Sequence, residues 1–264
     1  MNILQAIIFG AIQGFTEFLP VSSSGHLLVL KELFELQSVP ILFDVLLHVS
    51  TLVVVLIVFR KRIIDILVSM FRFVRRESTE DDKGNLLLVP IILGATVLTA
   101  GIGLVIEYYE FGQNPTVASI CFLITGLVLV LIHFTSGNRE YKELKPRDAF
   151  ITGIAQGFGV LPGISRSGIT ISAALFSGID REKAGEFSFL LSIPAILGAA
   201  ILKLKDFDEL MAVMSPVNLL VGVIVSFIVG LFSVLLLLKL VKGGKLFFFS
   251  FYLIPLGIWG LVAL

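Results

Sequence analysis

Six long apolar runs constrain this chain most, because each is close to the length of a membrane-spanning helix. A helix needs roughly 20 apolar residues to cross a bilayer. Only 15% of the chain is charged and 56% is hydrophobic, whereas about a quarter of a soluble domain is charged. We therefore expect an all-α integral membrane protein. The expected spans are 41–59, 86–106, 116–134, 187–202, 217–238 and 246–264. The fourth of these is short and would need flanking residues to cross the bilayer.

One unusual motif occurs twice. Gln-Gly-Phe, Leu-Pro and Ser-x-Ser-Gly recur between residues 13–26 and 156–170 at a spacing of 142 or 143 residues. The surrounding segments, 1–33 and 149–180, are apolar but are interrupted near the middle by Gly, Pro and Ser. Each segment could form two crossings or a re-entrant helix–loop–helix, and we favour the second because the half-helices are too short to span. Irregular backbone at membrane depth is tolerated where it is buried in protein or lines a cavity, so the motif loops are the expected functional site.

The order of these segments predicts two inverted repeats, 1–136 and 149–264, each with one re-entrant hairpin and three spans. An odd number of crossings in each repeat reverses the orientation of the second repeat. The distribution of basic residues agrees with this topology. The loops that would lie on one side of the membrane hold 16 of the 20 Lys and Arg residues, and loops rich in Lys and Arg are usually cytoplasmic. Both termini are then outside. The basic connecting loops are 60–83, 135–148, 178–186 and 239–245. Within the first of them, 77–83 is expected to be a solvated linker.

Ionisable side chains within membrane segments are costly and usually functional. Three of them lie in the motifs, and three lie outside and are read as helix caps, interfacial groups or supporting residues. A purely structural alternative is that the motif arginine clamps backbone carbonyls and that the motif glutamate is its ion-pair partner. The six candidates are Glu17, His26 and Arg166 in the motifs, with Asp44, His48 and Glu186 outside them.

The motif loops carry groups that suit a phosphorylated ligand. Ser22, Ser23 and Ser165 are good helix N-caps, so a half-helix is expected to begin near the midplane in each repeat. The free N–H groups and positive dipole ends of such helices bind anions, and the planar guanidinium of Arg166 fits phosphate oxygens. The expected phosphate-binding residues are Ser22, Ser23, Gly25, Arg166, Ser167, Gly168 and Thr170.

The remaining motif groups have catalytic character. Glu17 can act as an acid, a base or a metal ligand, and His26 can transfer a proton near neutral pH. Together with an anion site, these residues predict phosphoryl transfer or hydrolysis. The net charge of zero gives no reason to expect nucleic acid as a partner.

These residues resemble the bacterial undecaprenyl-diphosphate phosphatase family, also called bacitracin resistance proteins. The resemblance covers essentially the whole chain. It implies removal of the terminal phosphate of undecaprenyl diphosphate, which gives the monophosphate carrier lipid of cell-wall synthesis, and it implies bacitracin resistance. The matching segments are 13–17, 18–26, 162–170 and 184–194.

The resemblance also implies a cofactor, site residues and a location. Family activity depends on Mg²⁺ or Ca²⁺, for which Glu17 and Gln13 would be ligands. Glu17 matches the essential acid, and Gln13 stands where some members have Glu. The protein would lie in the bacterial plasma membrane with its site open to the outer face. The other positions that match functional residues of the family are His26, Ser165, Arg166 and Thr170.

Three questions stay open at this point. The nucleophile is either Ser165, which would form a phosphoenzyme, or a water activated by His26 or Glu17. Inverted repeats with broken helices are also common in transporters, so a flippase for isoprenoid lipid phosphates could use the same anion site. A homodimer is a further expectation about partners, beside the lipid substrate and the bilayer.

Overall fold

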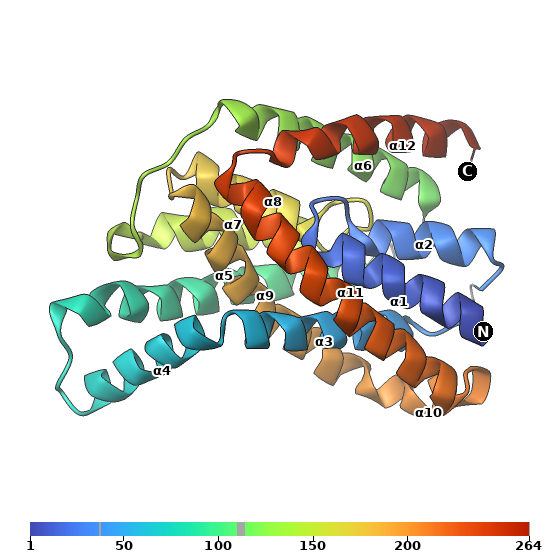
Figure 1. Cartoon of the computed structure of the whole chain (residues 1–264), viewed down its shortest axis with the longest axis horizontal. Helices are drawn as coiled ribbons and strands as arrows, with labels where there is room; N and C mark the ends of the chain where they lie inside the picture. Colours follow the sequence, from blue (N-terminus) through green and yellow to red (C-terminus); the bar gives the residue numbers. More distant parts are fainter. Residues whose placement is uncertain (37, 110–113, 264) are drawn as a thin grey trace.

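A computed structural model describes residues 1–36, 38–109 and 114–263, and it is built almost entirely of helices (Figure 1). Six helical segments in these ranges are long and apolar enough to cross a membrane, which confirms an all-α, multi-pass membrane protein. The fourth spanning helix extends well beyond 187–202, so it includes the flanking residues that this short apolar run was expected to need. The sixth was expected to reach residue 264, which lies outside the described residues. Four of the spanning segments contain α3 (Ile41–Val58), α5 (Lys83–Tyr108), α9 (Arg181–Lys203) and α11 (Pro216–Lys242). The other two are α6 (Pro115–Leu131) together with the 3-10 turn Ile132–Phe134 that follows it, and α12 (Ser250–Ala263) together with the 3-10 turn Leu246–Phe249 that precedes it.

The two motif segments form pairs of short helices. The first pair is α1 (Ile3–Phe18) and α2 (Ser23–Leu33), and the second is α7 (Pro146–Phe158) and α8 (Arg166–Phe176). They contain 16, 11, 13 and 11 residues. With a rise of about 1.5 Å per residue, none of them reaches across a hydrocarbon core of about 30 Å. These lengths agree with re-entrant hairpins, and the re-entrant path itself stays a prediction.

Helices of one half of the chain pack on helices of the other half. Helix α1 lies along α11 and helix α7 lies along α5, while α3 packs on α9 and α6 packs on α12 (Figure 1). Close approach of α1 to α11 needs a glycine, because a Cβ added at Gly14 would lie 2.5 Å from the Ser226 carbonyl oxygen. Such exchanged pairing is what two related repeats would produce, although their inverted relationship stays a prediction.

The connection after the first span differs from the expected loop. Residues Arg60–Val74 form helix α4, because apolar residues recur there at helical spacing between the basic ones. The linker 77–83 is exposed, as expected, except at Asp82, which is buried and accepts a hydrogen bond from Ser69 Oγ at 2.6 Å. A short helix not anticipated from the sequence, α10 (Phe207–Val213), precedes α11.

Arg139 ties both ends of the second hairpin together. Its guanidinium donates to the two carboxylate oxygens of Asp148 in α7, at 3.1 and 2.8 Å, and to the Ser177 carbonyl just after α8, at 2.7 Å. The hydrogen bonds with Asp148 raise the pKa of the Arg139 guanidinium. Since Asp148 is fully buried, this pair holds the hairpin that carries the second motif loop.

Candidate active site

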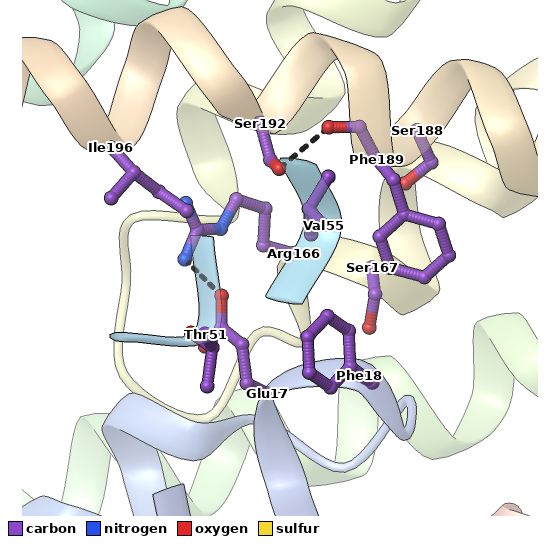
Figure 2. Close-up of a pocket in the computed structure, with 10 residues that line it drawn as sticks. All are labelled: Glu17, Phe18, Thr51, Val55, Arg166, Ser167, Ser188, Phe189, Ser192 and Ile196. Atoms are coloured by element: carbon purple, nitrogen blue, oxygen red, sulfur yellow. Dashed lines mark hydrogen bonds and ion pairs between the residues drawn. The ribbon is translucent and has the colours of Figure 1, made fainter. Parts of the chain in front are cut away.

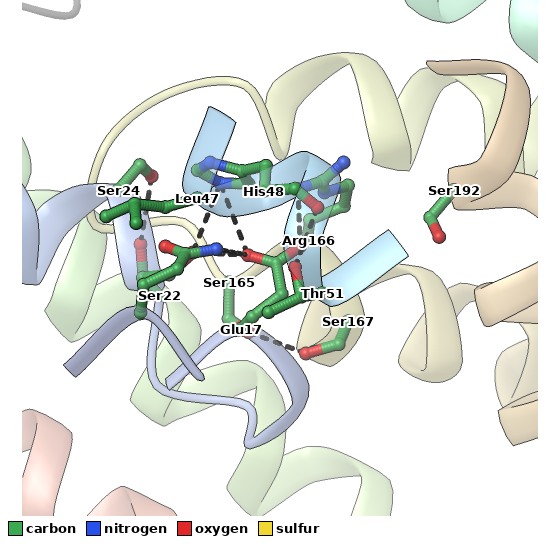
Figure 3. A network of polar contacts seen from close by, with 12 residues as sticks. Glu17, Ser22, Ser24, Leu47, His48, Thr51, Ser165, Arg166, Ser167 and Ser192 are labelled. Carbon is green, nitrogen blue, oxygen red and sulfur yellow. Dashed lines mark hydrogen bonds and ion pairs between the residues drawn. The ribbon is translucent and has the colours of Figure 1, made fainter. Parts of the chain in front are cut away.

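Glu17 lies at the centre of a polar cluster formed by both motif loops (Figure 3). It stands in the last turn of α1, and its side chain is only 8% exposed. One carboxylate oxygen, Oε1, accepts from Arg166 Nη2 at 2.7 Å. The other, Oε2, accepts from Ser23 Oγ at 2.6 Å and from Gln13 Nε2 at 3.1 Å. The fold therefore joins the acid of the first motif to the guanidinium of the second.

His48 completes the cluster from the side of α3. Its Nε2 lies 3.2 Å from Glu17 Oε2 and 3.5 Å from Ser23 Oγ. Its Nδ1 lies 2.7 Å from the Asp44 carbonyl oxygen, so Nδ1 carries a proton because a carbonyl only accepts. Sequence reasoning read His48 as a cap or supporting residue and missed this position. Its signal was an imidazole in the middle of an apolar span.

Asp44, read in the same way as His48, lies outside the cluster. Its carboxylate forms an ion pair with Lys31 Nζ at 2.7 Å. Glu186 also lies elsewhere, paired with Arg62 Nε at 2.8 Å and accepting from the Tyr141 hydroxyl at 3.0 Å. The cap or supporting role expected of Asp44 and the interfacial or supporting role expected of Glu186 stay predictions.

The two motif loops contact each other through Ser22. Its side-chain oxygen accepts from the backbone N–H of Gly163 at 2.9 Å and from that of Gly25 at 3.3 Å, which caps α2. Ser22 has a φ of 68°, a backbone conformation that costs a non-glycine residue about 1–3 kcal/mol. Gly163 has a φ of +92°, and a Cβ there would lie 2.1 Å from the Ala118 carbonyl oxygen. The contact therefore depends on glycine in the second loop.

Ser165 caps α8, as expected. Its Oγ accepts from the Gly168 N–H at 3.1 Å and lies 3.2 Å from Ser167 Oγ, and the residue is only 1% exposed. Thr170 donates to the Arg166 carbonyl at 2.7 Å and shares a short hydrogen bond with Ser188 Oγ. The expected phosphate-binding residues of the second loop thus surround the start of α8.

Ser23 and His26 differ from their expected settings. Ser23 is the first residue of α2, with Ser22 as its cap, so its hydroxyl is free to donate to Glu17. His26 has contacts away from the cluster: Nδ1 lies 2.7 Å from the Ser22 carbonyl and Nε2 lies 2.7 Å from the Tyr252 hydroxyl. Among the described residues, the structure brings His48 to the Glu17 carboxylate and leaves His26 elsewhere.

A narrow cleft opens beside the ion pair (Figure 2). It encloses about 10 Å³, which is room for about one water molecule. A diphosphate would therefore require the lining residues to move apart. Polar side chains from α1, α3, α8 and α9 and apolar side chains from α1, α3 and α9 form its walls: Glu17, Phe18, Thr51, Val55, Arg166, Ser167, Ser188, Phe189, Ser192 and Ile196.

The fold and this site define a polytopic membrane protein with a buried carboxylate–guanidinium centre built from two motif loops. Comparison with known proteins then places the chain: it belongs to the family of the bacitracin resistance protein BacA, whose pattern matches residues 6–259. The undecaprenyl-diphosphatase of Treponema denticola is 52% identical over 98% of this chain and 96% of its own length. Those of Carboxydothermus hydrogenoformans (99% and 97% covered) and Borreliella burgdorferi B31 (97% and 96%) are 44% and 41% identical.

Proposed function

We propose that this protein is a membrane enzyme that hydrolyses undecaprenyl diphosphate to undecaprenyl phosphate and inorganic phosphate. It thereby recycles the carrier lipid for peptidoglycan synthesis and confers resistance to bacitracin. The observation that carries the proposal is the buried Glu17–Arg166 pair in a chain of this family. The relatives reported above are named as diphosphatases, so the flippase alternative is not favoured.

Arg166 binds the reacting phosphate in this proposal. One of its donors contacts Glu17, and a guanidinium has five N–H donors in a planar fork that matches phosphate oxygens. It stands at the first position of α8, where the positive end of the helix dipole favours an anion. Stabilisation of charge on the transferred group is the main task in phosphoryl transfer.

Ser23 is the better placed of the serine candidates for the nucleophile. Its hydroxyl donates to Glu17 at 2.6 Å, which is the arrangement of a nucleophile and its base. Ser165, the serine that the sequence offered as a nucleophile beside an activated water, caps α8 and lies against Ser167. Activation of a water by Glu17 is the alternative that avoids a phosphoenzyme.

The reaction then has two steps. As Ser23 Oγ bonds to the terminal phosphorus, its proton passes to Glu17 Oε2. The bond from that phosphorus to the bridging oxygen breaks, and undecaprenyl phosphate leaves with the electron pair. The departing undecaprenyl phosphate takes the proton from Glu17, which is then free to act as a base. Water next attacks the phosphoserine as its proton passes to Glu17. The bond from phosphorus to Ser23 Oγ breaks, Ser23 Oγ takes that proton back, and inorganic phosphate leaves.

A divalent cation, Mg²⁺ or Ca²⁺, belongs to the proposal as the cofactor. Both ions prefer oxygen ligands, and Mg²⁺ is commonly bound by one or two protein groups together with substrate phosphates. Glu17 and Gln13 fit this role, because Gln13 is fully buried and its Oε1 has no hydrogen-bond partner among the described residues. No cluster of three or more His, Cys, Asp or Glu is found in the described ranges, so substrate oxygens would complete the site. The cation would neutralise phosphate charge beside the Glu17 carboxylate.

Location and assembly complete the proposal. The enzyme would lie in the bacterial plasma membrane, with basic connections in the cytoplasm and the site open to the outer face. A homodimer stays a prediction that neither the fold nor the relatives support.

The proposed function is tested by product analysis. Purified protein in detergent is incubated with undecaprenyl diphosphate, and the lipids are identified by mass spectrometry. We expect undecaprenyl phosphate and inorganic phosphate in equal amounts. Intact diphosphate, in a sample whose protein still binds the lipid, would overturn the proposal in favour of transport.

A further inference from the structure

His26 has both ring nitrogens engaged by the protein itself. Nδ1 faces the Ser22 carbonyl and Nε2 faces the Tyr252 hydroxyl, each at 2.7 Å. The carbonyl only accepts, so Nδ1 carries the proton, and the neutral ring then accepts from the tyrosine hydroxyl at Nε2. Tyr252, from α12 near the other end of the chain, thus donates to the ring nitrogen that this tautomer leaves as an acceptor.

Aromatic rings fix the orientation of this imidazole. The His26 and Tyr252 rings are stacked, with centroids 5.7 Å apart and an interplanar angle of 13°. The Phe122 ring meets His26 edge-on at 5.3 Å. The imidazole therefore has little freedom to turn towards another partner.

The hydrogen bond from His26 Nδ1 is accepted by the carbonyl of Ser22, the residue of the first motif loop that has a positive φ. Ser22 holds its positive φ of 68° while its side chain links both motif loops. Its carbonyl is the group that His26 Nδ1 holds. That carbonyl belongs to the peptide bond that leads into Ser23, whose hydroxyl donates to Glu17. Tyr252, His26 and Ser22 thus form a continuous chain of hydrogen bonds that ends one residue from the cluster.

We propose that Tyr252 is a positioning residue, which through His26 fixes the Ser22 carbonyl and so directs the Ser23 hydroxyl towards Glu17. This inference rests on the proposed function and gives His26 an anchoring task in place of the proton transfer expected from the sequence. The hydroxyl group of Tyr252 is the part that matters, because the ring alone can stack on His26 but cannot hold its Nε2 by a hydrogen bond.

Kinetics of Tyr252→Phe test the proposal, with Tyr108→Phe as the matched control because Tyr108 is 81% exposed. Loss of one hydrogen bond should lower kcat about tenfold with KM nearly unchanged, and the control should match the wild type. In a His26→Asn background the same substitution should have little further effect. An unchanged kcat, a rise in KM alone, or full additivity with His26→Asn would overturn the proposal.

A spectroscopic test is independent of turnover. The chain has only three histidines, His26, His48 and His133, so ¹⁵N-histidine labelling gives a simple spectrum that His26→Asn assigns. We expect His26 as the Nδ1–H tautomer, and a shift of its Nε2 resonance alone in Tyr252→Phe. An Nε2–H tautomer in the wild type, or no shift in the variant, would refute the proposal. Absence of diphosphatase activity in the wild type would instead refute the proposed function and leave this result intact.

Discussion

Arg166 Nη2 lies 2.7 Å from Oε1 of Glu17, a residue 149 positions earlier in the chain. Both side chains are largely buried, at 20% and 8% exposure. Removal of one member of a buried pair leaves an uncompensated charge, so the two residues depend on each other in the resting protein. Because the adjoining cleft holds only about 10 Å³, we infer that substrate binding separates the pair and that Arg166 exchanges a carboxylate for a phosphate.

Arg166→Lys is expected to be strongly impaired. Lysine keeps the positive charge but replaces the planar fork with a point charge that cannot bind two oxygens side by side. Loss of charge-assisted hydrogen bonds in the transition state should lower kcat/KM by about 100-fold. Steady-state kinetics of the purified variant in detergent measure this effect, with Arg75→Lys at an exposed position as the control. Turnover near the wild-type rate would contradict a bidentate clamp.

The two serine candidates can be separated directly. Ser23→Ala should lose at least about 100-fold in kcat, because it removes the hydroxyl that donates to Glu17. Ser165→Ala should retain turnover but lose about 1 kcal/mol of stability, since it removes the cap of α8. Rapid acid quenching followed by peptide mass spectrometry should find phosphate on Ser23. Phosphate on Ser165, or substantial turnover by Ser23→Ala, would reverse the assignment.

Arg139→Gln is expected to destabilise the protein. It leaves the fully buried Asp148 carboxylate without its bidentate partner, and a broken buried pair typically costs about 3–5 kcal/mol. Denaturant-induced unfolding of the purified protein measures the change. The control is Arg75→Gln, whose exposed pair with Glu77 should contribute no more than about 1 kcal/mol. Equal stability of the two variants would show that Arg139 does not hold the second hairpin.

Much of the fold was predictable because the bilayer restricts what an apolar segment can do. Six spans and two interrupted motif segments follow from length and hydropathy alone. Helix α4 was missed because its basic residues resemble a cytoplasmic loop, whereas its helical periodicity is visible only when charge is set aside. Positions of helix ends depend on packing partners that no local pattern encodes.

The candidate site was predictable in part. The repeated motifs identified Glu17, Arg166 and the loop serines, and the structure brings Glu17, Ser23 and Arg166 together. Which imidazole meets the carboxylate was not predictable, because it depends on how α3 packs beside α1. His26 lies in a motif yet faces Tyr252, while His48 lies outside the motifs yet faces Glu17.

The most direct test of the central claim is phosphate release from undecaprenyl diphosphate by purified protein, with and without Mg²⁺ or Ca²⁺. The wild type is compared with Glu17→Gln and Arg166→Ala, and Glu107→Gln, which alters a carboxylate at the protein surface, is the control. We predict metal-dependent release by the wild type and the control, and nearly complete loss in the two site variants although both remain folded. Release at the wild-type rate by either folded site variant would contradict the account.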